Sequence, residues 1–353
     1  MNRYTRQISL SKFGPDGQRK LTESKVLVVG LGGLGLPALQ YLNAMGVGTL
    51  GLVDQDIVDF HNLQRQILYT ESDVGHSKLQ TALDRLKEQN SETTLIGYDT
   101  FLTRENALEI VREYDVIVDA TDNFATRYLI NDACVLLNKP FVYGALHGFE
   151  GHVGVFNYNG GPTYRCLYPE MPSPHEVPNC DENGVLGVIP GIIGNLQALE
   201  VVKVITDIGH VLSGKLLVFD GLEQNYLKIN LQINPENLKI KKLADNYDDS
   251  SCHVVSSISA EEFSQKRLQE TCTVIDVRTS KEFELQHLPE AIHIPLNTLN
   301  LPKELTHTSQ PIYVVCQSGM RSERAIQQLQ ADYPKLKFLN ILGGMNRVSI
   351  LSH

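Results

Sequence analysis

Short apolar runs alternate with amphipathic segments through the first 235 residues of the chain. The apolar runs predict strands at residues 26–30, 49–54, 94–99, 115–120, 141–145, 151–156, 216–220 and 225–233. The amphipathic segments predict helices at 34–45, 78–89, 104–112, 125–137 and 191–206. Early alternation of this kind is typical of βαβ units on a parallel sheet, whereas the runs from residue 151 onward are spaced like antiparallel strands. We therefore expect an α/β domain with a mixed sheet.

The pattern changes near residue 241. Residues 241–253 are polar and aperiodic, which is typical of a linker. Buried-strand patterns then return at 274–278 and 311–315, followed by a helical pattern at 322–331. Because 353 residues are many for a single core, we predict two domains, 1–240 and 254–353, the second a small α/β domain.

Charge and cysteine content exclude several classes of protein. The 41 acidic residues outnumber the 31 basic ones, and the net charge of −10 argues against a nucleic-acid partner. The first residues lack the apolar core of a secretory signal, and no apolar run approaches the ~20 residues that span a bilayer. The six cysteines are scattered, as reduced thiols in a cytoplasmic protein would be.

A glycine-rich turn follows the first predicted strand and precedes a helix. Its glycines are Gly30, Gly32, Gly33 and Gly35. Glycines in this context let the backbone approach a phosphate, and the helix N-terminus supplies N–H groups. Asp54 lies about 20 residues beyond, where a carboxylate can bind ribose hydroxyls. On the glycines alone, an NAD site is as well supported as an ATP site.

Three charged residues shift the balance towards ATP. Arg65 and Lys78 can both reach a triphosphate, whose cleavage requires neutralised charge. Asp122 follows the strand at 115–120, at the edge of the sheet where ligands bind, and a carboxylate there is suited to magnesium. An NAD-dependent oxidoreductase would have no use for these cations. We therefore expect chemistry on ATP.

Several motifs together resemble the MoeB/ThiF/HesA family, the bacterial relatives of ubiquitin-activating enzymes. They are Arg3-Tyr-Thr-Arg6-Gln7, Gly30-Leu-Gly-Gly-Leu-Gly35, Asp54-x-Asp56, Asn62-Leu-Gln-Arg65-Gln66, Gly75-x-x-Lys78 and Ala120-Thr-Asp122-Asn123. The resemblance covers about residues 1–235. It implies a Rossmann-like adenylation domain that uses ATP and magnesium. Its substrate would be the C-terminal Gly-Gly carboxylate of a ubiquitin-fold sulfur carrier protein.

The resemblance also implies roles for individual residues. Asp54 would bind the ATP ribose, Arg65 and Lys78 the phosphates, and Asp122 the magnesium ion. Arg6 would reach the phosphates from the partner subunit of a homodimer. The remaining implied nucleotide-site residues are Asp56, Asn62, Gln66, Asn123 and the four glycines of the turn.

The cysteines match the family pattern at one position and are missing at others. The family typically holds a structural zinc with two Cys-x-x-Cys pairs. The first pair would fall at Thr163-Tyr-Arg-Cys166 and the second near Asn234-Pro-Glu-Asn-Leu-Lys-Ile240, which contains no cysteine, so three of four cysteines are missing and we expect no zinc. Cys180, in a Pro-rich polar loop, matches the crossover-loop cysteine of the family, which takes a persulfide or a covalent link to the carrier. An incidental exposed thiol is the alternative for Cys180.

A second chemical motif lies near the C-terminus. Cys316-Gln-Ser-Gly-Met-Arg321 follows an apolar run and leads into a helix. Such a loop forms a nest of N–H donors that lowers a thiol pKa to about 3.5–7.5 and can hold a persulfide. The six-residue loop resembles rhodanese, as do Glu282-Phe, His287-Leu-Pro-Glu-Ala and Gly343-Gly344, over about residues 254–353. We expect Asp276 and Arg278 to form a structural pair.

Adenylation and sulfur transfer on one chain make chemical sense together. The hypothesis is that the first domain makes a carrier acyl-adenylate. Cys316 would take sulfur from a cysteine desulfurase or thiosulfate, and this sulfur, through Cys180, would displace AMP and leave a thiocarboxylate. The rivals are an NAD-dependent oxidoreductase, a non-catalytic carrier-binding scaffold and a tRNA-modifying dehydratase of the same fold. The sequence leaves open whether the carrier serves molybdopterin, thiamine or a thiolated tRNA.

Overall fold

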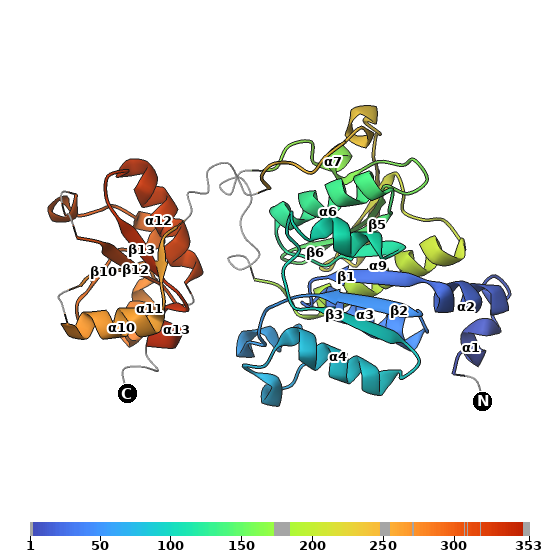
Figure 1. The fold of residues 1–353 in the computed structure, drawn as a ribbon, viewed down its shortest axis with the longest axis horizontal. Coiled ribbons are helices and arrows are strands. Elements are labelled where there is room, and N and C mark those ends of the chain that lie inside the picture. Colours follow the sequence, from blue (N-terminus) through green and yellow to red (C-terminus); the bar gives the residue numbers. More distant parts are fainter. Residues whose placement is uncertain are drawn as a thin grey trace. The chain divides into compact units, whose positions relative to one another are not determined.

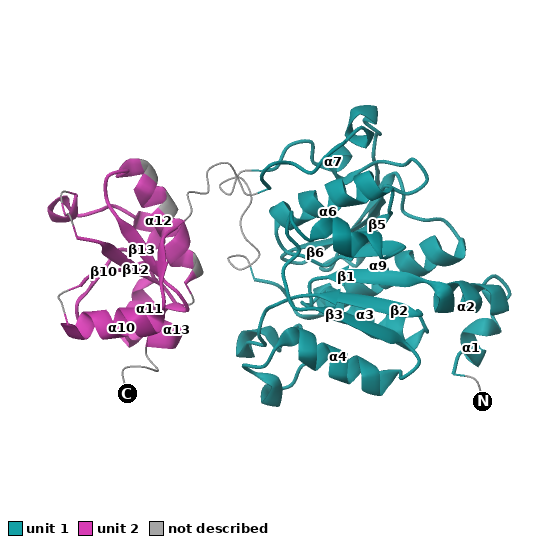
Figure 2. Ribbon diagram, in the orientation of Figure 1, with its two compact units in different colours: residues 1–249 teal, residues 250–353 magenta. Residues whose placement is uncertain are grey.

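The chain forms two compact units, residues 1–249 and 250–353 (Figure 2). The computed structural model describes residues 3–172, 184–247, 255–269, 272–306, 308, 310–317 and 319–348. Cys180 and Cys252 lie outside the described residues. In each unit, helices cover a twisted sheet (Figure 1).

An eight-stranded sheet organises the first unit, with the order β3-β2-β1-β4-β5-β6-β7-β8. Its strands are β1 (Lys25–Val29), β2 (Thr49–Val53), β3 (Thr94–Tyr98), β4 (Val116–Asp119), β5 (Phe141–His147), β6 (Glu150–Phe156), β7 (Lys215–Asp220) and β8 (Asn225–Asn230). The pairs from β3 to β5 are parallel, and those from β5 to β8 are antiparallel. The predicted mixed sheet is confirmed.

Helices cover both faces of this sheet, so the central strands are buried on two sides. The helices are α1 (Thr5–Ile8), α2 (Gly14–Glu23), α3 (Gly35–Ala44), α4 (Lys78–Gln89), α5 (Ala107–Arg112), α6 (Phe124–Leu137), α7 (Tyr164–Leu167) and α9 (Val188–Thr206), with 3-10 turns η1 (Phe60–Asn62), η2 (Glu71–Asp73) and η3 (Pro235–Leu238). Along β1, Val26 and Val28 join one apolar core, and Leu27 and Val29 join the other. This alternation explains why the strand is a continuous apolar run in the sequence.

Helix α9 corrects one expectation. At 19 residues it is long and apolar enough, by length and composition, to cross a membrane, so the expectation that no apolar run approaches that length is wrong. More than half of the helix is buried, and it packs against α3, β5 and β6. Its apolar character on all sides is that of a helix in the core of a domain.

Part of the predicted linker packs on the first unit. Leu243 and Tyr247 are buried in its core. The Tyr247 hydroxyl donates a hydrogen bond of 2.8 Å to Asp132 Oδ2 on α6. Residues 248–254 lie outside the described part of the chain, so the linker boundaries stay a prediction.

The second unit contains a five-stranded parallel sheet with the order β11-β10-β12-β13-β9. Its strands are β9 (Ser257–Ile258), β10 (Thr273–Asp276), β11 (Ala291–His293), β12 (Ile312–Val315) and β13 (Phe338–Ile341). Its helices are α10 (Ala260–Gln269), α11 (Ser280–Leu285), α12 (Met320–Asp332) and α13 (Gly344–Val348), with 3-10 turns η4 (Leu296–Thr298) and η5 (Lys303–Leu305). The predicted small α/β domain is confirmed.

Candidate active sites

The glycine turn connects β1 to α3 and is tightly packed. Gly30 has a φ of +96°, and a Cβ there would lie 2.7 Å from the carbonyl oxygen of Ala120. A Cβ on Gly35 would lie 2.0 Å from the carbonyl oxygen of Gly30. Glycine is therefore required at both positions, and the turn lies directly beside the carboxyl end of β4.

Asp54 holds the glycine turn in place. Its Oδ2 accepts a 2.7 Å hydrogen bond from the Leu31 N–H, and its Oδ1 accepts a 2.8 Å bond from the Asp56 N–H. Burial raises the pKa of Asp54 above its ordinary value, although these N–H groups and the nearby Lys78 charge oppose the rise. The sequence predicts a ribose contact for Asp54, which stays a prediction; the structural bond to Leu31 was not foreseen.

Lys78 is brought against the residues that follow β2. Its Nζ lies 2.9 Å from Asp56 Oδ2, and its own N–H donates to the Asp56 carbonyl at 2.9 Å. Lys78 is the first residue of α4 and is only 7% exposed. The Tyr69 hydroxyl ties this point to the glycine turn, because it lies 3.1 Å from the Lys78 carbonyl oxygen and 3.3 Å from that of Leu31. A phosphate here would compete with Asp56 for the ammonium group.

The segment after η1 lies on the glycine turn. A Cβ on Gly33 would be 3.4 Å from Arg65 Cγ, and one on Gly32 would be 3.8 Å from Gln66 Nε2. Gln66 Oε1 is buried and has no hydrogen-bond partner in the part of the chain that the structure describes. Asn62 is buried, and its Oδ1 accepts from the Asp59 N–H at 3.3 Å. The structure thus brings Arg65 and Gln66 to the predicted phosphate turn.

Asp122 is exposed on a braced turn after β4. Thr121 is fixed from two sides, since its hydroxyl donates to Asp119 Oδ1 at 2.7 Å and its carbonyl accepts from Arg127 Nη2 at 2.8 Å. Asn123, which is also exposed, caps α6 by accepting from the Thr126 N–H at 2.9 Å. Arg127 was missed from the sequence; an arginine one turn into a largely apolar helix is the signal that could have indicated it.

Two predicted residues are not placed at this site. Arg6 is exposed on α1, and its neighbour Gln7 donates to the Met45 carbonyl at 2.9 Å, at the C-terminal end of α3. The glycine turn is at the other end of this helix, whose 10 residues span about 15 Å. Within one chain, Arg6 therefore does not reach the turn. Cys180 lies outside the described residues.

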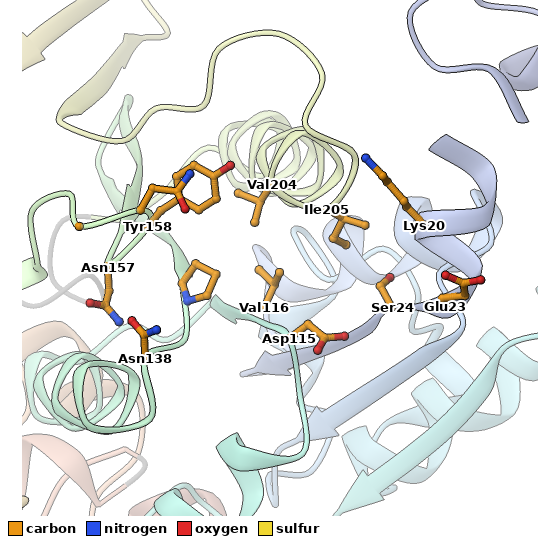
Figure 3. Close-up of a pocket in the computed structure, with 13 residues that line it drawn as sticks. Lys20, Glu23, Ser24, Asp115, Val116, Asn138, Asn157, Tyr158, Val204 and Ile205 are labelled. Carbon is orange, nitrogen blue, oxygen red and sulfur yellow. The ribbon is translucent and has the colours of Figure 1, made fainter. Parts of the chain in front are cut away.

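A separate cavity lies at the amino ends of the strands of the same sheet, opposite the carboxyl ends that carry the glycine turn (Figure 3). Its volume is about 560 Å³, and its lining includes Ser24 and Asp115, which precede β1 and β4, together with Lys20 and Asn157. Apart from Arg6 and Cys180, the predicted adenylation-site residues lie on the segments that follow the carboxyl ends of β1, β2 and β4. The cavity is therefore distinct from the candidate adenylation site.

Cys316 forms the centre of a second candidate site, in the second unit. It follows β12 and is fully buried. Its Sγ accepts hydrogen bonds from the Gly319 N–H at 3.1 Å and the Ser322 hydroxyl at 3.4 Å. Gly319 has a φ of +101°, which lets the loop curl around the sulfur. The loop thus places two hydrogen-bond donors around one sulfur atom.

Two ion pairs frame this loop. Arg321, at its end, makes two hydrogen bonds with Glu282 on α11, at 2.9 and 2.6 Å. Arg278 pairs with the buried Asp276 at 2.7 Å and also donates to Gln317 Oε1 at 3.0 Å. The predicted structural pair of Asp276 and Arg278 is confirmed. The partner of Arg321 was not foreseen.

Comparisons with known proteins match a family to each part of the chain. The chain matches the ThiF family over residues 4–240 and the rhodanese-like domain over residues 259–350. It is 41% identical to "Adenylyltransferase and sulfurtransferase MOCS3" of Aedes aegypti, over 93% of this chain and 81% of that protein. It is 39% identical to the protein of the same name from Caenorhabditis briggsae, over 97% and 92%. The crystal structure of E. coli MccB with ATP has the same fold in the first unit, with a TM-score of 0.59 and 24% identity over 66% of this chain and 72% of that one.

The chain therefore belongs to the ThiF family and carries a rhodanese domain at its C-terminal side. The predicted family, fold class and enzyme class are confirmed: the chain is an ATP-using adenylyltransferase joined to a sulfurtransferase. An NAD-dependent oxidoreductase is not supported by any of these relationships.

Proposed function

We propose that the chain activates a small ubiquitin-fold sulfur carrier protein at its C-terminal Gly-Gly carboxylate and converts it to a thiocarboxylate. The observation that supports the proposal is that Arg65, Lys78 and Asp122 lie on segments that border one glycine turn: Arg65 approaches Gly33, Lys78 pairs with Asp56 beside Asp54, and Asp122 follows β4, which pairs with β1. A carboxylate is a poor acyl donor, and sulfur cannot displace its oxygen until that oxygen is made part of a good leaving group. Transfer of AMP to the carboxylate achieves this.

The first step joins two anions. A carboxylate oxygen of the carrier attacks the α-phosphorus of ATP, the bond to pyrophosphate breaks, and an acyl-adenylate forms. Arg65 and Lys78 neutralise the phosphates, and Asp54 orients the ribose. Alignment of the two reactants is worth about 7–11 kcal/mol. The backbone N–H groups of the glycine turn receive the nucleotide phosphates.

Asp122 is the residue we assign to magnesium. It is exposed at the carboxyl end of β4, and carboxylates together with substrate phosphates are the ligands that this ion prefers. When bound, the ion would neutralise charge on the leaving pyrophosphate. Asn62, Gln66, Asp56 and Asn123 complete the nucleotide site in this proposal.

The second step moves sulfur. The terminal sulfur of a Cys316 persulfide attacks the acyl carbon, the bond to AMP breaks, and an acyl disulfide forms. A second thiol, which we assign to Cys180, then attacks Cys316 Sγ. The thiocarboxylate leaves with the electron pair of the broken S–S bond, and a disulfide between the two cysteines remains for reduction by a thiol.

The finer features of the proposal rest on the family resemblance. We propose a homodimer in which Arg6 of each subunit completes the site of its partner, because Arg6 does not reach the turn of its own chain. The sulfur donor is a cysteine desulfurase persulfide or thiosulfate. The enzyme serves carriers of molybdenum cofactor or thiamine biosynthesis and is cytoplasmic. In a departure from the family, it carries no structural zinc, because three of the four ligand cysteines are absent.

The decisive experiment measures carrier-dependent exchange of labelled pyrophosphate into ATP. A Gly-Gly-tailed ubiquitin-fold carrier and MgATP should give exchange that disappears when the carrier lacks its last two glycines. ATP binding without exchange would instead support the carrier-binding scaffold. If the exchange depended on modified tRNA and ignored the carrier, the dehydratase reading would replace the proposal.

A further inference from the structure

The two segments where the family resemblance implies zinc ligands come together around one sulfur. Thr163 and Cys166 lie in the first segment and Asn234 and Asn237 in the second, and each pair has the spacing of Cys-x-x-Cys. Cys166 Sγ lies 3.5 Å from Thr163 Oγ1, accepts a 3.3 Å bond from the Asn234 N–H, and accepts a 3.5 Å bond from Asn237 Nδ2. The four residues are therefore neighbours in space although 68 residues separate Cys166 from Asn234.

This set of groups does not fit a metal. Structural zinc takes cysteine sulfur, histidine nitrogen or carboxylate oxygen, and it takes four of them. Only Cys166 belongs to these types, and the described residues contain no group of three or more His, Cys, Asp and Glu side chains that could hold a metal ion. The N–H groups of Asn234 and Asn237 around the sulfur are hydrogen-bond donors, which do not bind a cation.

The distances from Cys166 to two of the other side chains are nevertheless similar to those between the ligands of a zinc ion. Four sulfurs at about 2.3 Å from zinc lie about 3.8 Å from one another in a tetrahedron. The separations of 3.5 Å from Cys166 Sγ to Thr163 Oγ1 and to Asn237 Nδ2 are close to this edge. A hydrogen-bonded cluster of the same size thus occupies the place of the metal cluster.

We propose that Thr163, Cys166, Asn234 and Asn237, here called the Cys166 clasp, join α7 to η3 without a metal. Turn η3 has no buried residue, so the apolar core does not hold it. Helix α7 is anchored independently on α6, because Arg165 Nε and Nη2 each donate at 2.8 Å to Asp132. The hydrogen bonds of the clasp therefore hold η3 against α7. They also fix the start of the segment that continues to the buried Leu243.

The first test is metal content and chelator response of the full chain purified without added metal. We expect less than about 0.1 zinc per chain by mass spectrometry, and the same thermal unfolding midpoint with and without EDTA. About one zinc per chain that disappears in Cys166→Ser would overturn the proposal. An EDTA-dependent fall in the midpoint of the unaltered chain would do the same.

The second test rebuilds the metal site. The triple variant Thr163→Cys, Asn234→Cys, Asn237→Cys should bind about one zinc per chain and should lose thermal stability in EDTA. Failure of the folded triple variant to bind zinc would show that the four positions do not converge. In a third measurement, amide exchange at Asn234 should accelerate in Cys166→Ala but not in Lys239→Ala, an exposed change on the same segment. Equal exchange in all three proteins would mean that the sulfur does not hold η3.

Discussion

Arg321 and Glu282 form a two-point ion pair across 39 residues of sequence, with Nη1 2.9 Å from Oε2 and Nη2 2.6 Å from Oε1. Hydrogen bonding to Arg321 is the main reason why the pKa of Glu282 falls to about 2. The carboxylate is therefore ionised throughout the neutral range. Because Arg321 ends the loop that begins with Cys316, the pair fixes the end of the sulfur loop to α11.

Replacing Glu282 should impair sulfur transfer through the position of Arg321. In Glu282→Gln the second charge of the pair is lost, and the guanidinium group is free to move. We expect kcat/KM for sulfur transfer from thiosulfate to cyanide to fall about 10-fold to 100-fold. Glu284→Gln, an exposed change on the same helix, is the control. Equal activity of the two variants would show that Glu282 does not position the arginine.

The same pair predicts how stability depends on pH. Glu282 has a lower pKa in the folded chain than its ordinary value of 4.5, so its contribution is present above about pH 4.5 and is lost as the pH falls towards 2. The difference in Tm between the unaltered chain and Glu282→Gln should therefore narrow from pH 6 to pH 3. Calorimetry of both proteins across this range measures it. A gap that widens on acidification would contradict the assigned pair.

Lys78 should be required for adenylation. Its ammonium group is a buried cation 2.9 Å from Asp56 Oδ2, next to the Asp54 that binds the glycine turn, and loss of one such group typically costs about 10²–10³ in kcat. We expect Lys78→Ala to lower carrier-dependent pyrophosphate exchange by this factor. Lys87→Ala, on the last turn of the same helix, should leave the exchange unchanged. Sulfur transfer from thiosulfate to cyanide should be normal in both variants, which shows that the second unit is intact.

The strands that position the sites were predictable because they are buried on both faces. β1, β2 and β4 appear in the sequence as continuous apolar runs, each followed by residues of the candidate site. Helices α2 and α7 were not predicted. The α2 helix carries few buried residues, and the four-residue α7 is too short to show a helical period.

The partners of the charged residues were not predictable in the same way. Asp54 meets the N–H of Leu31 only because β1 and β2 pair in one register, with Val29 opposite Val53. Arg321 meets Glu282 only because β10 and β12 are parallel neighbours, so that α11 and α12 both begin beyond the carboxyl ends of these strands. Local sequence gives the type of each residue, whereas tertiary packing decides which hydrogen-bond partner it receives.

Gly35 should tolerate no side chain. The Cβ of an alanine would lie 2.0 Å from the Gly30 carbonyl oxygen, so the backbone of the turn would have to move. We expect Gly35→Ala to lower the free energy of unfolding by about 3 kcal/mol, as severe overpacking does. Gly191→Ala is the matched control, because Gly191 is inside α9 and its Cβ would meet no atom within 4 Å beyond its chain neighbours and the backbone of its own helix. This change should raise the free energy of unfolding by about 0.5–1 kcal/mol. Urea unfolding of the three proteins measures both changes.

Arg127 should stabilise the turn that carries Asp122. Its guanidinium group is buried, lies 5.5 Å from the ring centres of Phe124 and Tyr143, and donates to the Thr121 carbonyl at 2.8 Å. Arg127 also lies 4.0 Å from the fully buried Asp119 carboxylate, so Arg127→Leu would leave that group without a cation.

We therefore expect Arg127→Leu to lower the free energy of unfolding by about 3–5 kcal/mol, as loss of one partner from a buried ion pair does. Arg104→Leu removes an exposed pair with Asp245 and should cost less than about 1 kcal/mol. In the folded protein, Arg127→Leu should also raise the magnesium concentration needed for half-maximal pyrophosphate exchange, because the Asp122 turn loses its brace. If Arg127→Leu lost stability but kept the same magnesium dependence, Arg127 would not affect how Asp122 binds magnesium.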